Sequence, residues 1–119
     1  MDSRKEATVR ALARDFAMFL KENRFDDAHA LLSSELKRQQ TPETLRHDLN
    51  RMIEYGDGPV EDVEVVMVDE MTGWADRQSH DLGWVYVAMA GSEFNEAVTV
   101  ILAIEDGVPV VRDIEWGRP

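Results

Sequence analysis

Asp69 and Arg112 are the two side chains whose positions most suggest chemistry, because each is a charged residue in an apolar, strand-like stretch. Asp69 continues an alternating run of apolar residues that begins at Val63. Arg112 stands between Val110 and Ile114. Alternate residues of a strand lie on one face, so both charges are expected on the inner face of a sheet. Buried charges are usually paired, so the favoured interpretation is an ion pair of Arg112 with Asp69 or with another acid. In the functional alternative, Arg112 holds an anionic or carbonyl group while Asp69 transfers a proton.

The twelve residues 72–83 are the most site-like stretch of the chain, because loops of this length in compact domains are often functional or mobile. They include Trp74, Asp76, Arg77, His80 and Asp81. His80 beside Asp81 suggests a general base and the group that orients it. The favoured interpretation is a solvated loop with one anchoring Trp.

Motifs for metals, phosphates and dinucleotides do not occur. No two histidines have the spacing of a metal site, and the acidic clusters lack the calcium-loop pattern. There is no cysteine, which excludes disulfides and thiolate catalysis. We therefore expect no metal and no cofactor.

The charge of the chain is divided unevenly along its length. The 119 residues carry a net charge of −11, yet residues 1–55 sum to zero, so residues 56–119 carry all of it. Such a chain is a poor candidate for binding nucleic acid or an anionic membrane, both of which need Lys and Arg. The longest apolar runs are far shorter than a membrane span, and the N-terminus does not read as a secretory signal. A cytoplasmic protein is the simplest expectation.

The first half reads as three amphipathic helices. The first begins at Ser3 and Glu6, which have capping-box spacing, and stops at Asn23. The second begins near Phe25 or Asp26 and extends to Leu36 as a single helix. The third begins at Thr41 and Pro42 and ends at Gly56. Apolar residues recur along one side of each, so the helices need a partner layer.

The second half reads as four strands, over residues 60–71, 83–90, 95–105 and 108–116. A three-residue turn, Glu105–Gly107, is preferred because it sets Leu102 opposite Val110 and keeps the apolar face together. A four-residue turn at 91–94 sets Val85 beside Val100. The chain is thus predicted to be one α+β domain, 1–119, with a helical half (1–55) and a sheet half (56–119). Three helices pack on one face of a curved four-stranded antiparallel sheet.

The outer face of this sheet is unusually apolar for a face that water should cover. Acidic residues surround it at positions 64, 70, 113 and 115. An apolar centre with a charged rim is typical of an interface, so we expect a homodimer through this face. The predicted interface residues are Val66, Val68, Trp84, Tyr86, Thr99, Ile101 and Val111. The alternative is that a loop of the chain itself covers the face.

Two segments carry a resemblance to a known family, residues 13–37 (ARDFAMFLKENRFDDAHALLSSELK) and residues 96–116 (EAVTVILAIEDGVPVVRDIEW). The first is similar to the first two helices, and the second to the closing strands, of the nuclear-transport-factor-2-like superfamily, which includes ketosteroid isomerase, scytalone dehydratase and polyketide cyclases. The resemblance implies a cystatin-like α+β cone with a mostly apolar pocket and dimers through the outer sheet face. The chain departs from the pattern in placing a third helix straight after the second, with no clear short strand between.

The candidate ligand-binding residues for such a pocket are Tyr55, Trp74, His80, Arg112 and Trp116. The isomerase branch would need a Tyr and two acids that converge inside the cone. No position here matches that trio, since Tyr55 ends a helix and Tyr86 is expected to face outward. The dehydratase branch needs inward histidines, and only His29 is even partly inward in this reading.

Three functions remain open. The favoured one is a non-catalytic homodimeric module that binds a small apolar ligand or a protein partner in or beside the cone pocket. The second is a small isomerase, dehydratase or hydrolase that uses Asp69, Arg112 and Tyr55. The third is an acidic inhibitor or immunity-type partner of a basic protein, motivated by the net charge alone.

Overall fold

The computed structural model describes residues 1–56 and 58–118 and has helices in the first half and an antiparallel sheet in the second, as predicted. The helices are α1 (Ser3–Lys21), α2 (Phe25–Ala30), α3 (Ser34–Gln39) and α4 (Pro42–Ile53). The strands are β1 (Asp62–Asp69), β2 (Asp81–Ala90), β3 (Asn95–Glu105) and β4 (Val108–Trp116). The sheet order follows the chain, β1-β2-β3-β4. The predicted strand bounds are correct to within two residues at every end.

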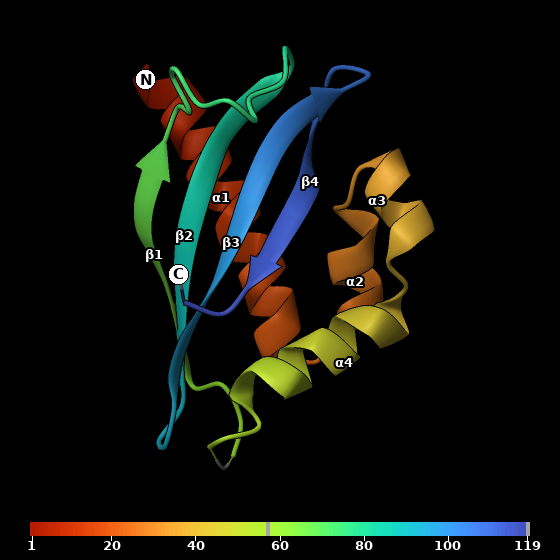
Figure 1. Ribbon diagram of the computed structural model, residues 1–119, viewed down its shortest axis with the longest axis vertical. Coiled ribbons are helices and arrows are strands. Elements are labelled where there is room, and N and C mark those ends of the chain that lie inside the picture. Colours follow the sequence, from red (N-terminus) through yellow and green to blue (C-terminus); the bar gives the residue numbers. More distant parts are fainter. Residues whose placement is uncertain (57, 119) are drawn as a thin grey trace.

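Helix α1 packs its apolar stripe against the inner face of the sheet. Its N-cap is Asp2, whose side chain accepts the amide of Lys5, so the predicted capping box at Ser3 and Glu6 is wrong by one residue. Asn23 follows the helix with a φ of 59°, which confirms the predicted stop. The buried residues of the stripe are Val9, Ala13, Phe16, Ala17 and Leu20. In Figure 1, α1 passes behind β2 and β3, while α2, α3 and α4 lie beside the β4 edge.

The second predicted helix is split into α2 and α3, because its middle pairs with the edge strand β4. The amide of Ser33 donates to the Val111 carbonyl at 2.7 Å, and the Val111 amide donates to the Leu31 carbonyl at 2.9 Å. Leu32 thereby forms a single parallel bridge with Val111. Ser33 then caps α3 through its hydroxyl, which accepts the Leu36 amide. The edge of β4 needs hydrogen-bond partners that a continuous helix could not supply.

Helix α4 begins as predicted. The Thr41 hydroxyl accepts the Thr44 amide, the Thr44 hydroxyl accepts the Thr41 amide, and Pro42 occupies the first turn. Leu45 and Leu49 are its buried residues.

The pairing of β2 with β3 confirms the predicted register, with Val85 opposite Val100 and Val87 opposite Val98. All four side chains are fully buried and belong to one hydrophobic core with α1, α2 and α4. The four-residue turn at 91–94 is also confirmed.

The β3–β4 hairpin differs from the prediction. Its turn has two residues, Asp106 and Gly107, with φ of 51° and 79°, and Glu105 pairs with Val108. Two positive φ values are the signature of a type I′ turn, for which Asp-Gly is a preferred sequence. The register then shifts between Ile101 and Leu102, which makes Arg112 the extra residue of a β-bulge.

The two-residue turn and a second bulge, at Val66, change which residues face inward. Leu102 pairs with Val111, so Val111 is fully buried in the core instead of belonging to the outer face. Beyond the Val66 bulge, Val68 pairs with Val85 and packs on the core, so its assignment to the outer face is also wrong. On the same strand, Met67 pairs with Tyr86 and faces outward. A single inserted residue reverses the side of every residue that follows it, because side chains alternate along a strand.

Candidate functional site

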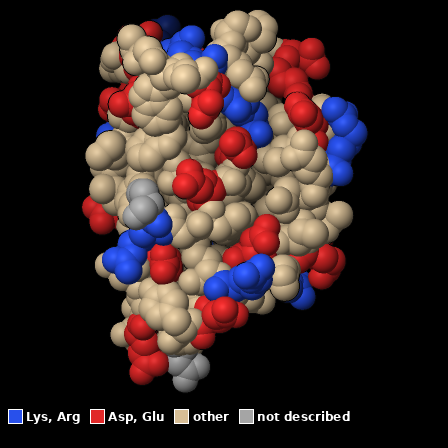
Figure 2. Space-filling model, in the orientation of Figure 1, with Lys and Arg blue, Asp and Glu red and all other residues tan. Residues whose placement is uncertain are grey.

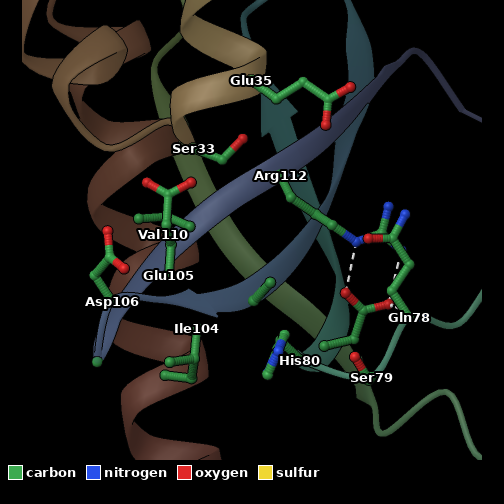
Figure 3. A pocket seen from close by; sticks show the side chains of 13 residues that line it. Ser33, Glu35, Gln78, Ser79, His80, Ile104, Glu105, Asp106, Val110 and Arg112 are labelled. Atoms are coloured by element: carbon green, nitrogen blue, oxygen red, sulfur yellow. Dashed lines mark hydrogen bonds and ion pairs between the residues drawn. The ribbon is translucent and has the colours of Figure 1, made fainter.

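A groove of about 550 Å³ lies where the start of α3, the tip of the β3–β4 hairpin and the residues before β2 meet (Figure 3). Its apolar lining consists of Ala103, Ile104 and Val110. Its polar lining includes Ser33, Glu35, His80, Glu105, Asp106 and Arg112. The groove therefore has both an apolar surface and charged groups, which is typical of small-molecule and peptide sites.

Glu105 joins the hairpin to α3. Its carboxylate accepts the amide of Ser34 at 3.0 Å and the Ser34 hydroxyl at 2.8 Å. These two hydrogen bonds lower the pKa of Glu105 below its ordinary value, the backbone amide contributing most. Glu105 is thus ionised, and its hydrogen bonds fix the hairpin to the start of α3 at one side of the groove.

Arg112 and Asp81 form a two-pronged ion pair at another wall. The guanidinium Nε donates to Oδ1 of Asp81 at 2.5 Å, and Nη2 donates to Oδ2 at 2.7 Å. The Asp81 side chain is 0% exposed and that of Arg112 is 15% exposed. Figure 3 shows Arg112 reaching from β4 toward the segment that carries Gln78. The prediction that Arg112 pairs with an acid is correct, and that acid is Asp81 of the sheet half.

The pairing keeps both groups charged. Burial raises the pKa of Asp81, but the Arg112 guanidinium and the Gln78 amide outweigh it and leave that pKa below its ordinary value. The hydrogen bond from Arg112 to Asp81 likewise raises the pKa of the guanidinium. A carboxylate whose two oxygens are both bound to an arginine is a poor proton acceptor at neutral pH. The pair is therefore suited to holding structure rather than to general acid–base catalysis.

Asp69 takes no part in this pair and lies far from Arg112 in the sheet. It belongs to β1 and Arg112 to β4, the two opposite edges of the sheet. Its register partner is Trp84, and its carboxylate accepts the amide of Met71 at 2.6 Å. The expectation that Asp69 and Arg112 share the inner face is wrong for both, because the bulge at Val66 turns Asp69, and the two-residue hairpin turn turns Arg112, to the other side.

The five candidate ligand residues do not converge on one point. His80 and Arg112 both line the groove. Tyr55 is exposed, and its hydroxyl accepts the Asn95 amide at 3.0 Å, so it supports the β2–β3 turn. Trp116 borders a shallow depression of about 260 Å³ against α4. Trp74 lies on the outer face of the sheet.

The outer face carries a row of aromatic rings. The rings of Trp74 and Trp84 are 5.6 Å apart and meet edge to face, and Trp84 stacks on Tyr86 at 6.1 Å. Five predicted interface residues remain on this side of the sheet, namely Val66, Trp84, Tyr86, Thr99 and Ile101. Figure 2, which looks onto the face opposite α1, shows a broad tan surface with acidic and basic groups scattered over it.

The sequence does not predict Asp81 as the partner of Arg112. Its pattern places Asp81 in the loop before the second strand, but that strand begins two residues earlier than predicted, at Asp81 itself. The residues Asp76 and Gln78 contribute through backbone groups, which leave no signal in side-chain chemistry. The bulge at Arg112 decides which acid the guanidinium reaches, and a bulge is a product of non-local packing.

Within residues 1–56 and 58–118, no three His, Asp or Glu side chains come together as metal ligands. None of the described helices is both long and apolar enough to cross a membrane.

Comparison of the chain with protein-family models, with curated proteins and with solved structures gives no match. The resemblance to the nuclear-transport-factor-2-like superfamily therefore rests on the order and pattern of the elements alone.

Proposed function

We propose that this chain is a non-catalytic binding module that pairs with a second copy of itself through the outer face of its sheet. One observation carries the proposal: apolar side chains remain open to solvent on this face. Val66 is 51% exposed, Met67 54% and Trp74 38%. Beside them, Trp84 and Tyr86 are half-buried in the isolated chain. Contiguous apolar surface of this kind marks interaction sites in monomeric folds.

The charges of the face fit a symmetric pair. Asp113 and Glu115 are exposed on β4. Arg118 lines the same depression as Tyr86, and its guanidinium is exposed and 3.8 Å from Glu96. A twofold axis sets each patch against its own rotated copy, so a face with both signs can bring opposite charges together. A face with acids alone would repel its copy.

The arrangement of the charged candidates favours binding over catalysis. Arg112 is bound to Asp81, and Asp69 lies at the opposite edge of the sheet. The isomerase-like alternative needs these groups to converge on a substrate. A small apolar ligand would find its place in the groove, whose lining includes Ala103 and Val110.

The cone of the nuclear-transport-factor-2-like superfamily remains our proposal for the fold family. The order of helices followed by an antiparallel sheet supports it, as does the strand-like bridge of Leu32 to β4.

Analytical ultracentrifugation tests the self-association. The wild-type chain is expected to sediment with twice the mass of one chain at micromolar concentration. Trp84→Glu is expected to sediment as a monomer, because it sets a charge in the apolar centre of the interface. Val108→Glu is the matched control, since Val108 is as exposed as Met67 but lies at the hairpin start, and it is expected to remain dimeric. A monomeric wild type, or a Trp84→Glu variant that stays dimeric, would contradict the proposal.

A further inference from the structure

The connection between β1 and β2, residues 70–80, sets one indole on the outer face. The Trp74 ring lies against Trp84, which in turn stacks on Tyr86, so a loop side chain extends the aromatic row of β2. Trp74 is the side chain of this loop that belongs to the proposed binding face. The position of its ring depends on the hydrogen bonds that fix the loop.

The two ends of this loop are anchored differently. At its start, Met71 is fully buried and has a φ of 65°, and its amide is bound by the Asp69 carboxylate. Between the anchors, the Trp74 amide donates to the Met71 carbonyl at 3.0 Å, and the Arg77 amide donates to the Trp74 carbonyl at 3.2 Å. These short-range bonds shape the turn. Two further contacts hold its second half: Nε of Arg77 donates to the Glu70 carbonyl at 3.4 Å, and the amide of Ile104 on β3 donates to the His80 carbonyl at 2.9 Å.

Arg112 attaches the middle of the loop, between these contacts, to β4 at two points. Besides both oxygens of Asp81, its Nη2 donates to the backbone carbonyl of Asp76 at 3.3 Å. The Asp81 carboxylate also accepts the amide of Gln78 at 2.8 Å. One guanidinium on the edge strand β4 therefore organises the loop from Asp76 to Asp81.

We propose that Arg112 is a positioning residue for the outer face, holding the 70–80 loop in the conformation that places Trp74 against Trp84. Without the guanidinium, the Asp81 carboxylate would be buried with the Gln78 amide as a hydrogen-bond partner but with no cation to balance its charge, which is strongly unfavourable. The loop would open to let water reach that carboxylate, and Trp74, two residues before Asp76, would leave Trp84. The consequence for binding rests on the proposed function, whereas the consequence for the loop does not.

Two variants of Arg112 test this inference. Arg112→Met removes the charge and all three hydrogen bonds, and Arg112→Lys keeps the charge but cannot form the two-pronged contact. The first readout is the exciton couplet that closely spaced indoles give in far-ultraviolet circular dichroism, and Trp74→Phe shows which part of the signal belongs to the Trp74–Trp84 pair. The second readout is the dissociation constant of self-association. Arg24→Met is the control, because it removes an exposed ion pair with Asp27 elsewhere on the chain.

We expect Arg112→Met to lose at least half of the couplet, Arg112→Lys to lose a smaller part, and Arg24→Met to keep all of it. Self-association of Arg112→Met is expected to weaken about tenfold, as for the loss of one aromatic contact at an interface. A folded Arg112→Met that keeps the full couplet overturns the inference. If Arg112→Met does not fold, an unchanged couplet in Arg112→Lys overturns it in the same way.

The readouts also separate the two proposals. A monomeric wild type whose couplet depends on Arg112 supports the positioning role and overturns the proposed self-association. A dimeric Arg112→Met with a lost couplet and an unchanged dissociation constant overturns the contribution of Trp74 to the binding face.

Discussion

The two faces of the sheet are both apolar in sequence, but they are built from different kinds of apolar residue. The inner face uses branched aliphatic side chains such as Val85 and Val98, which are fully buried beneath α1. The outer face uses Trp84 and Tyr86, which remain half-buried, and buried alanines such as Ala97. Aliphatic side chains have no polar atom to satisfy, whereas Trp and Tyr have a polar group that favours a partly wet surface. The aromatic row, with the exposed Val66 and Met67 beside it, therefore distinguishes the outer face from the closed core.

Ion pairing follows the same division. Among the described residues, the most buried side-chain ion pair, Asp81 with Arg112, lies on the outer side of the sheet. The inner face beneath α1 is lined by aliphatic residues without a charged group among the buried core. The inner face is thus held by packing, and the outer side is organised by a charge network at its margin.

The largest expected difference between the two faces is in the free energy of unfolding, and two neighbouring residues on β3 measure it. Leu102→Ala removes a fully buried side chain and should lower the free energy of unfolding by about 3–4 kcal/mol, because it leaves a cavity in the core. Ile101→Ala alters a half-buried side chain of the outer face and should cost about 1 kcal/mol in the monomer. Urea unfolding at concentrations where the chain is monomeric measures both. Equal losses would mean that the faces do not differ as described.

The next largest loss of stability is expected from the ion pair of Asp81 with Arg112 on the outer side of the sheet. Asp81→Asn leaves Arg112 without its ionic partner and should cost about 2–3 kcal/mol at neutral pH, at the low end for a buried pair because Arg112 keeps some contact with solvent. The folded-state pKa of Asp81 lies below the ordinary value of 3.8, so its contribution is present above about pH 4 and is lost as pH falls through the folded-state pKa. The difference in unfolding free energy between wild type and variant should therefore shrink in acid. A difference that stays constant from pH 7 to about pH 2 would show that the carboxylate charge is not responsible.

The smallest expected effect tests the turn that assigns β4 residues to the two faces. Gly107 has a φ of 79°, and a Cβ there would meet open space, so Gly107→Ala introduces backbone strain alone. We expect a loss of about 1 kcal/mol with an unchanged sheet register, because the buried Val111 and the bulge at Arg112 hold β4 in place. Thermal unfolding gives the loss, and amide exchange along β3 and β4 reports the register. A changed protection pattern would show that the turn, rather than the core, sets the register.

Much of the fold could be predicted from local patterns. Thr41 and Pro42 mark the start of α4, Asn23 adopts the left-handed conformation after α1, and the pairing of Val85 with Val100 follows from burial of one face. The candidate site was predictable only in part. Arg112 was singled out correctly as a paired cation, but its partner, its side of the sheet and its contact with Asp76 were not.

Periodicity and capping act within a few residues, so the sequence by itself determined the helical half, the four strands and the apolar character of both sheet faces. Only the tertiary structure decided where those patterns are interrupted. The break between α2 and α3 exists because Leu32 completes the edge of β4, and the bulge at Arg112 exists because Val111 and Ile114 must both reach the core across a two-residue turn. Each interruption is decided by residues far apart in the chain. The two-residue turn moves the charge of Arg112 from the inner face to the outer side, and the bulge returns Ile114 to the inner face. For that reason, the partner of Arg112 could be known only once the sheet was assembled.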